Sequence, residues 1–458
     1  MFSKHFLRTV NGLRSYAVSQ EKSTRSLKSP GGKNLVLIDG VRIPFLLSGT
    51  DYKNVMPHDL ARGALLGLHN KLKFPKECVG SLIFGTVIQE VKTSNIAREA
   101  SLGAGFSDFT PAHTVTMACI SSNIAITSSM GLLACGAVDV AIAGGVEFLS
   151  DAPIRFSRRV RSIMLDFRKA KTLAQKANLL SRLISSETFK LDLPAVAEFS
   201  TNETMGHSAD RLAAAFGITR EDQDNYAIRS HSFAKQASDN GFLEDLVPIK
   251  IPGIENPIAK VDNGIRPSSK EALAKLKPAF IKPHGTITAA NSSFLTDGAS
   301  ACLLTTEEKA KQMGWKPKAY LRDFIYVSQD PKDQLLLGPA YATPKILDKN
   351  KLTIKDISAF EYHEAFAGQI LANMAAMDCD FFCKEYMKRP GKFGSIPMDK
   401  LNTWGGSLSI GHPFGATGVR LVTTAANRLI KEDGQFALVA ACAAGGQGHA
   451  ILIERYPN

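Results

Sequence analysis

Residues 113–147 read HTVTMACISSNIAITSSMGLLACGAVDVAIAGGVE, and this stretch decides the fold. Residues 113–117 include β-branched side chains and predict a short strand. Small side chains dominate residues 121–135, and Gly136 follows them, which is typical of a tightly packed helix that ends at a glycine. Residues 138–147 are apolar and predict a buried strand. This order of strand, helix and strand predicts a layered α/β fold.

The same alternation continues on both sides of this stretch. In the first third it predicts strands over 35–45 and 77–87 and a helix over 57–72. In the last third it predicts strands over 318–327, 357–361, 436–443 and 448–454 and helices over 367–377 and 415–430. Both thirds place a cysteine in a turn of small residues beside a buried strand. We therefore expect an internal duplication.

The part of the chain between the first and last thirds differs from both in amino-acid composition. It is charged, interrupted by Gly and Pro, and predicts helices over residues 209–216 and 220–237. We interpret it as an insertion into the first α/β unit. The expected division is a first unit over 35–153 that is completed by 285–306, an inserted loop domain over 154–284, and a second unit over 307–458.

Composition and charge exclude several classes of protein. The 458 residues are 44% hydrophobic and 21% charged, which excludes a wholly disordered chain. No apolar stretch reaches the roughly 18 residues of a transmembrane helix. The seven cysteines form no CxxC pair and no Cys/His ladder, so we expect no disulfide framework, no metal site and a reducing compartment.

The net charge of +12 is concentrated in two segments. Residues 1–34 carry +6 and residues 152–190 carry +8, which leaves −2 for the rest of the chain. Residues 1–16 are basic, free of acids and amphipathic, which predicts a mitochondrial transit peptide followed by a polar linker up to residue 34. A frayed basic tail is the alternative. Folding should begin near Leu35.

The second basic segment repeats apolar residues at helical spacing. This basic amphipathic pattern favours contact with an anionic membrane over about residues 154–190. The alternative is a pair of helices that packs on the body with a solvated basic face. Nucleic acid is a poor partner, because aromatic residues are not interleaved with the charges. The expected membrane contacts are Arg158, Arg159, Arg161, Phe167, Arg168 and Lys169.

Two residues in small-residue loops are candidates for a nucleophile and its base. Cys119 lies at a strand-to-helix junction, where free N–H groups and the helix dipole lower a thiol pKa and can hold an oxyanion. His412 lies between glycines in GGSLSIGHPFGATG, residues 405–418, and is a candidate base. The alternatives are a buried structural cysteine and a turn histidine satisfied by the backbone.

Two further blocks carry groups that can move protons. Cys442 begins CAAGGQG, residues 442–448, and His363 begins HEAF, residues 363–366. A purely structural glycine turn and a helix cap that involves Glu364 are the alternatives. HEAF is not HExxH, so a zinc protease is not supported. Together, a nucleophilic thiol, a histidine base and a second thiol suit a reaction in which two protons must move.

These four blocks, together with GTITAANSSFLTDGASA at residues 285–301, resemble the thiolases, in the order in which that family has them. The resemblance extends from Leu35 to Asn458. It implies the thiolase fold, with two duplicated βαβαβαββ halves in a five-layered α-β-α-β-α core and an inserted, mostly helical loop domain.

The resemblance also implies a role for each site residue. Cys119 would attack the keto carbon of a 3-ketoacyl-CoA, activated by His412. Cys442 would donate and accept the second proton, and His363 would complete an oxyanion hole with His412. The backbone N–H groups of Cys119 and Ala444 would form the other oxyanion hole. His363 stands where the family more often has Asn, and Ala444 where it has Gly.

The implied activity is thiolysis of 3-ketoacyl-CoA in mitochondrial fatty acid β-oxidation, with long-chain substrates indicated by the HEAF and CAAGG variants and by the basic insertion. No cofactor is implied, because CoA is a substrate. Implied partners are a second copy of this chain, a hydratase/dehydrogenase subunit in an α2β2-type complex, and cardiolipin on the matrix side of the inner membrane. The alternatives are a biosynthetic short-chain thiolase and an inactive lipid-binding scaffold. Candidate CoA contacts are Ser293, Arg266 and Lys277.

Overall fold

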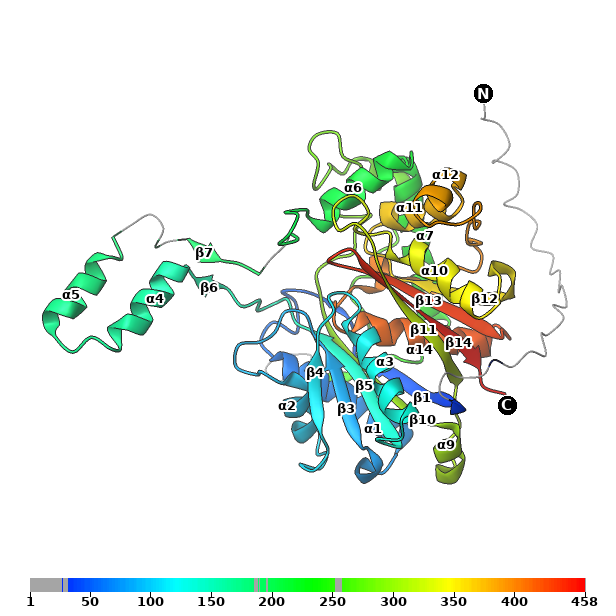
Figure 1. Ribbon diagram of the computed structural model, residues 1–458, viewed down its shortest axis with the longest axis horizontal. Helices are drawn as coiled ribbons and strands as arrows, with labels where there is room; N and C mark the ends of the chain where they lie inside the picture. The colour runs from blue at the N-terminus through cyan, green and yellow to red at the C-terminus, as the bar shows by residue number, and fades with distance from the viewer. Residues whose placement is uncertain are drawn as a thin grey trace.

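A ten-stranded mixed sheet forms the centre of the molecule (Figure 1), with the strand order β12-β13-β14-β11-β1-β10-β5-β3-β4 and β2 paired with β10. Two half-sheets join where β1 and β11 pair antiparallel. The strands are β1 Leu35–Arg42, β2 Leu46–Leu47, β3 Ser81–Gly85, β4 Ala112–Val115, β5 Val140–Glu147, β10 Thr296–Thr306, β11 Ala319–Ser328, β12 Ile357–Tyr362, β13 Phe436–Ala443 and β14 Gln447–Arg455.

This computed structural model describes residue 27 and residues 32–184, 188, 190–194, 197–251 and 258–457. The leader expected over residues 1–34 therefore lies almost entirely outside the described residues. None of the helices within these ranges is both long and apolar enough to cross a membrane.

The two half-sheets repeat one topology. In the first half, β1, β10, β5, β3 and β4 are neighbours in that order. In the second half the order is β11, β14, β13 and β12, and Leu401 then forms a parallel bridge with Phe360 at the place that corresponds to β4. The parallel pairs β3–β5 and β12–β13 correspond, as do the antiparallel pairs β5–β10 and β13–β14. The expected duplication is confirmed.

Helices complete the five layers. The central helices α3 Ser121–Ala134 and α14 Thr417–Lys431 share one buried cluster with residues of both half-sheets. Helices α1 Pro57–Leu72 and α2 Ile96–Gly103 cover the outer face of the first half-sheet. Helices α10 Gly338–Lys349 and α11 Ala367–Met377 cover that of the second. Because helices cover both faces, the central strands read as continuous apolar runs. The five-layered α/β architecture with two similar halves, expected from the resemblance, is confirmed.

Glycines bring the loops at the ends of the two central helices close together. A Cβ on Gly418 would overlap the side chain of Asn123 at the start of α3. A Cβ on Gly145 would overlap the carbonyl oxygen of Gly415, in the loop before α14. These close approaches require glycine, and they place the N-terminal ends of α3 and α14 side by side.

The insertion has two parts. A hairpin of α4 Arg158–Phe167 and α5 Leu173–Ser181, between β6 Arg155–Phe156 and β7 Leu191–Asp192, projects from the body (Figure 1, left). The second part packs on the body through α6 Met205–Ala215 and α7 Arg220–Asp239. The smaller elements of the chain are β8 Ile249–Lys250, β9 Ile258–Ala259, α8 Lys270–Ala274, α9 Glu307–Met313, α12 Asp380–Glu385 and α13 Ser407–Ile410.

Candidate active site

A strained turn presents Cys119 just before α3. Ala118 has a φ of +45°, in the left-handed region that non-glycine residues rarely adopt. The Ser121 hydroxyl holds this turn, because it accepts a hydrogen bond from the Met117 N–H at 2.8 Å and donates one to the Ala118 carbonyl at 2.7 Å. The turn therefore sets the direction of the Cys119 side chain.

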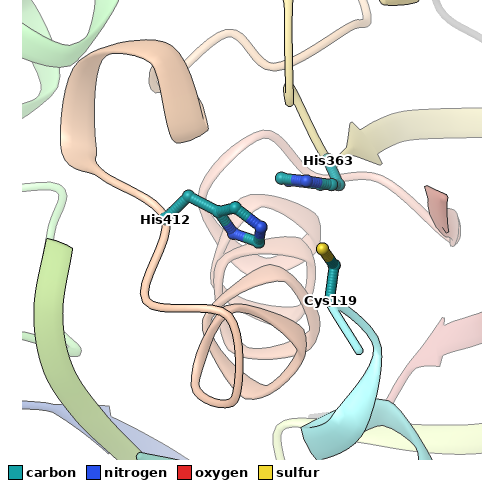
Figure 2. Close-up of side chains that lie close together, drawn as sticks. All are labelled: Cys119, His363 and His412. Carbon is teal, nitrogen blue, oxygen red and sulfur yellow. The ribbon is translucent and has the colours of Figure 1, made fainter. Parts of the chain in front are cut away.

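The fold brings Cys119 together with two histidines that lie far away in the sequence. Figure 2 shows Cys119, His363 and His412 facing one another. His363 follows β12, and His412 lies in the loop before α14. The Cys119 Sγ and one nitrogen of each imidazole all lie within 4.8 Å of one another. The histidine ring centroids are 3.9 Å apart. A thiol and two imidazoles are also ligands that zinc accepts.

Both imidazoles are buried and neutral at neutral pH. Burial, together with the smaller effect of the positive charge of Arg420, lowers the pKa of His363 to about 3. Burial also lowers the pKa of His412 well below its usual value, with smaller contributions from His363 and Arg420. A neutral imidazole has a lone pair on one nitrogen, so either ring can take up a proton.

Cys119 is a thiol in the resting site. The residue is partly accessible to solvent, yet the protein around it raises the pKa of its thiol to about 12. Hydrogen bonds from the N–H groups of Ala444 and Cys119 oppose this shift, whereas the negative charge of Glu147 reinforces it. The expectation that the helix end lowers this pKa is wrong, because desolvation is the larger effect. Cys119 therefore needs a base.

Cys442 lies beside this cluster, at the end of β13. It is buried, and burial raises the pKa of its thiol, with a further contribution from the nearby Cys119. The glycine turn after it brings the Ala444 N–H to the Cys119 thiol. Ala444 keeps a negative φ, whereas Gly445 and Gly446 have φ values of +84° and +68°. The turn can thus contain alanine at 444 without strain.

The residue after His363 is a buried carboxylate that holds the site together. Glu364 accepts hydrogen bonds from the Tyr226 hydroxyl at 2.9 Å, the Ser230 hydroxyl at 2.8 Å and the Asn402 amide at 2.7 Å. It also accepts from the Leu408 N–H at 3.2 Å. Glu364 thereby ties α7 of the insertion to the loop that contains α13. A helix cap was the alternative considered from sequence, and nothing local in HEAF indicates this network.

Glu147 is a second buried carboxylate that sequence reasoning missed. At the end of β5 it accepts hydrogen bonds from the N–H groups of Val87 at 3.1 Å, Ile88 at 2.8 Å and Gly415 at 2.9 Å. Burial raises its pKa to about 8, against the effect of these three bonds. Glu147 connects the first half to the loop of His412. The signal available in the sequence was an acidic residue, Glu147, at the end of an apolar strand.

The other candidates do not lie in this cluster. The Ser293 N–H donates to the Ala365 carbonyl at 2.9 Å, which places Ser293 beside the HEAF loop. Arg266 and Lys277 are exposed on the insertion, and their role in CoA binding stays a prediction. In the hairpin, Arg161 pairs with Asp192 at 2.6 Å, and the Arg159 guanidinium donates to the Arg182 carbonyl at 3.0 Å. The remaining predicted membrane residues, Arg158, Phe167, Arg168 and Lys169, are exposed.

Comparison with known proteins identifies relatives along the whole folded chain. Residues 35–308 match the family described as thiolase, N-terminal domain, and residues 315–455 match thiolase, C-terminal domain. The chain is 67% identical over 446 residues to the mouse "Trifunctional enzyme subunit beta, mitochondrial", covering 97% of this chain and 93% of that protein. It is 61% identical to a "Probable 3-ketoacyl-CoA thiolase" of Caenorhabditis elegans, covering 92% and 94%. The crystal structure of human mitochondrial 3-ketoacyl-CoA thiolase superposes with a TM-score of 0.79 at 28% identity, covering 93% of this chain and 99% of that one.

Proposed function

This chain belongs to the thiolase family, and from that premise we propose how its site works. The protein is a 3-ketoacyl-CoA thiolase (acetyl-CoA C-acyltransferase) of mitochondrial fatty acid β-oxidation, and CoA is its substrate rather than a cofactor. The mechanism rests on one observation: the Cys119 thiol lies close to two neutral imidazoles and to a second thiol. The finer proposal is that the substrates are long-chain.

The first half-reaction uses Cys119 and His412. The Cys119 thiol gives its proton to His412 while its sulfur bonds to the 3-keto carbon, and the carbonyl electrons move to the oxygen. The N–H groups of Cys119 and Ala444, which already contact this sulfur, would hold that oxyanion. When the oxyanion collapses, the bond between Cα and Cβ breaks and leaves an acyl-Cys119 thioester and an acetyl-CoA enolate.

The second set of proton transfers uses Cys442. Its thiol protonates the enolate carbon, which releases acetyl-CoA. The Cys442 thiolate then takes the proton of an incoming CoA thiol, and the CoA sulfur attacks the acyl-Cys119 thioester. Cys119 leaves as a thiolate and recovers its proton from His412. A shortened acyl-CoA is the second product, and every group returns to its starting state.

Thiolysis assays test this function and its chain length together. We expect the protein to cleave a 3-ketoacyl-CoA of sixteen carbons faster than acetoacetyl-CoA, and Cys119→Ala to abolish both activities. A preference for acetoacetyl-CoA would support the short-chain alternative instead. Inactivity of the wild-type protein toward both substrates would favour a lipid-binding scaffold, and activity in Cys119→Ala would remove Cys119 from the mechanism.

We propose that CoA lies against the insertion, whose residues 154–284 we treat as a loop domain between the two parts of the first unit. Ser293 beside the HEAF loop would contact the pantetheine arm, and Arg266 and Lys277 would face the phosphates. A rise in the KM for CoA in Arg266→Gln or Lys277→Gln, at unchanged kcat, would support this. An unchanged KM in both variants would contradict it.

The relatives' names indicate an assembly. Since they are called subunit beta of a trifunctional enzyme, this chain is a partner of an alpha subunit. We further propose a dimer of this chain held by two alpha subunits that carry hydratase and dehydrogenase activities. Light scattering of the co-expressed subunits should give the mass of an α2β2 complex. The mass of a one-to-one pair would contradict the dimer.

We also propose that the hairpin of α4 and α5 rests on the inner membrane from the matrix side, and that residues 1–34 direct the chain there. The hairpin exposes Met164 at 54%, Leu165 at 60% and Leu173 at 87% of their surfaces, far more than core side chains. The exposed charges Arg158, Arg168 and Lys169 flank this apolar surface. Apolar contact plus positive charge is the combination that binds anionic lipid headgroups.

Flotation with cardiolipin-containing liposomes tests this contact. Arg158→Glu, Arg168→Glu and Lys169→Glu, made together, should release the protein from the liposomes, while thiolysis of a soluble substrate continues. A matched control changes the same charge on the body at the exposed Lys316, Lys332 and Lys355. Equal binding of both triple variants, or equal loss, would contradict a contact specific to the hairpin.

A further inference from the structure

The two histidines of the site are held by different hydroxyl groups. Nδ1 of His412 lies 2.7 Å from the Thr417 hydroxyl, and Nδ1 of His363 lies 3.0 Å from the Ser407 hydroxyl. Nε2 of each ring is buried and has no hydrogen-bond partner among the described residues. Nε2 is therefore the nitrogen available to the thiol and to a substrate. Whether it carries a hydrogen depends on the bond at Nδ1, because a neutral imidazole has one hydrogen.

The contacts of Thr417 favour an arrangement in which its hydroxyl accepts the bond from His412. Its hydroxyl also lies 3.0 Å from the Pro413 carbonyl oxygen, which can only accept. The one hydroxyl hydrogen points to that carbonyl, so the contact with His412 is satisfied only if Nδ1 carries the hydrogen. Nε2 of His412 then has the lone pair.

Ser407 is in the opposite situation. Nη2 of Arg420 lies 3.1 Å from its hydroxyl oxygen, and a guanidinium can only donate. Ser407 accepts from Arg420, and among the described residues the remaining partner of its hydroxyl is Nδ1 of His363, to which it donates its own hydrogen. This nitrogen then has the lone pair, and Nε2 of His363 carries the hydrogen. Ser407 and Arg420 are both buried, at 0% and 1% exposure, so water does not replace these bonds.

We propose that Thr417 and the Ser407–Arg420 pair are positioning residues that hold the two site histidines in opposite tautomers, with a lone pair at Nε2 of His412 and a hydrogen at Nε2 of His363. This inference rests on the proposed function for its chemical meaning. None of the three residues touches the reacting atoms in this arrangement. They act through the rings that they orient.

Opposite tautomers give the two rings separate tasks. The Cys119 proton has one acceptor in reach, Nε2 of His412, while the hydrogen at Nε2 of His363 is already directed toward a developing oxyanion. After the transfer, His412 carries hydrogens on both nitrogens and Thr417 still accepts from Nδ1. Both Nε2 atoms are then donors at the moment when the enolate oxygen needs them. Arg420 keeps a positive charge near both rings, which favours their neutral forms before the transfer.

Substitution of Thr417 separates this role from packing. Thr417→Val keeps the shape and removes the acceptor, so we expect kcat and the rate of Cys119 alkylation by iodoacetamide to fall by about 10²-fold, with KM changed less than about twofold. Thr417→Ser should restore most of both rates. Thr424→Val changes a buried threonine elsewhere in α14 and should leave both rates unchanged. An equal loss in Thr417→Ser, or rates in Thr417→Val equal to those of Thr424→Val, would overturn the proposal.

Neutron diffraction of the wild-type protein tests the tautomers directly and needs no variant. We expect deuterium at Nδ1 of His412 and at Nε2 of His363. Deuterium at Nε2 of His412, or at Nδ1 of His363, would overturn the assignment. Ser407→Ala should lower kcat by about tenfold or more, because a freed His363 can turn its lone pair to the oxyanion. Alkylation and diffraction require no thiolysis, so an inactive wild-type protein would contradict the proposed function and leave this test intact.

Discussion

The two halves of the molecule have the same strand order and place different chemical groups at equivalent positions. Gly145 pairs with Gly85 across the parallel strands β5 and β3, as Ala440 pairs with Tyr362 across β13 and β12. Two residues further along, β5 ends at Glu147 and β13 reaches Cys442, opposite Gly298 and Gly448 respectively. One topological position thus carries a carboxylate in the first half and a thiol in the second.

The difference shows that the two halves of the duplicated fold contribute different chemical groups to the site. Glu147 uses its oxygens to accept three backbone N–H groups, one of them from the loop that carries His412. Cys442 forms no such scaffold, and its thiol lies near that of Cys119. In the proposed mechanism, the first half supplies the nucleophile and a structural carboxylate. The second half would supply the base, the oxyanion donor and the second proton carrier.

The largest expected effect comes from removing the thiol at this position. Cys442→Ala should lower kcat for thiolysis by about 10³-fold, within the range of a lost proton-transfer group, because neither the enolate nor the incoming CoA has its partner. Alkylation of Cys119 by iodoacetamide should continue at the wild-type rate. The exposed Cys135 offers a control, and Cys135→Ala should change neither rate. Loss of Cys119 alkylation in Cys442→Ala would contradict separate roles for the two thiols.

The corresponding change in the first half should affect stability. In Glu147→Gln an amide –NH2 replaces one carboxylate oxygen and faces backbone N–H groups that have no other acceptor among the described residues. We expect a loss of about 1–3 kcal/mol in the free energy of unfolding by urea at pH 7. The loss should be smaller at pH 9, because the wild-type carboxyl, whose pKa burial raises to about 8, is then ionised at a cost that the neutral amide does not have. Glu99→Gln on the exposed surface of α2 should cost nothing measurable. Equal stability of both variants would show that Glu147 does not hold the two halves together.

The buried imidazoles of the second half should make the protein sensitive to acid. The pKa of His363 falls from about 6.5 in an unfolded chain to about 3 in the folded protein. Between these values the unfolded chain binds more protons, so stability is full above pH 6.5 and falls as the pH falls toward 3. This residue contributes up to about 1.4 kcal/mol per pH unit.

His363→Asn, which cannot titrate, should remove that contribution. The measurement is the difference between the slopes of unfolding free energy against pH for the variant and the wild-type protein, because Glu147 and Glu361 also titrate across this range. Equal slopes would mean that His363 has the same pKa in the folded protein as in the unfolded chain.

Local sequence pattern predicted much of the fold, because several elements are defined by their own periodicity. The helices over 57–72 and 367–377 and the strand over 436–443 have the bounds that the structure shows. No helix was expected for residues 338–349, where Pro339 and Pro344 disrupt the local signal. There α10 forms because its buried face packs on β14, and such tertiary contacts leave no local trace.

The site was predictable in its parts but not in its electrostatics. Cys119, His363, His412 and Cys442 were selected because each lies in a distinctive loop, and the structure brings them close together. The direction of the Cys119 pKa shift was wrong, because a helix end is visible in sequence whereas the surrounding burial is not. For the same reason Glu147 was missed and Glu364 was considered only as a helix cap. Their partners come from segments that lie far away in the chain.

The smallest expected effect concerns a hydrogen bond from the insertion to the turn after Cys442. The Glu198 carboxylate accepts a hydrogen bond from the Gly445 N–H at 3.0 Å, one residue beyond the Ala444 N–H that contacts Cys119. A hydrogen bond of this kind stabilises a turn by about 0.5–1.5 kcal/mol, so Glu198→Ala should lower kcat by roughly threefold to tenfold as the Ala444 N–H loses its alignment.

Glu198→Gln separates the bond from the charge, because its amide oxygen can still accept from Gly445. We expect this variant to keep most of the wild-type kcat. Iodoacetamide should also alkylate Cys119 slightly faster in this variant, because the negative charge that helps to raise the thiol pKa is gone. Equal losses in the two variants would show that the charge matters more than the bond. In that case the negative charge of Glu198, and not its hydrogen bond to the Gly445 N–H, would influence the turn that contains Ala444.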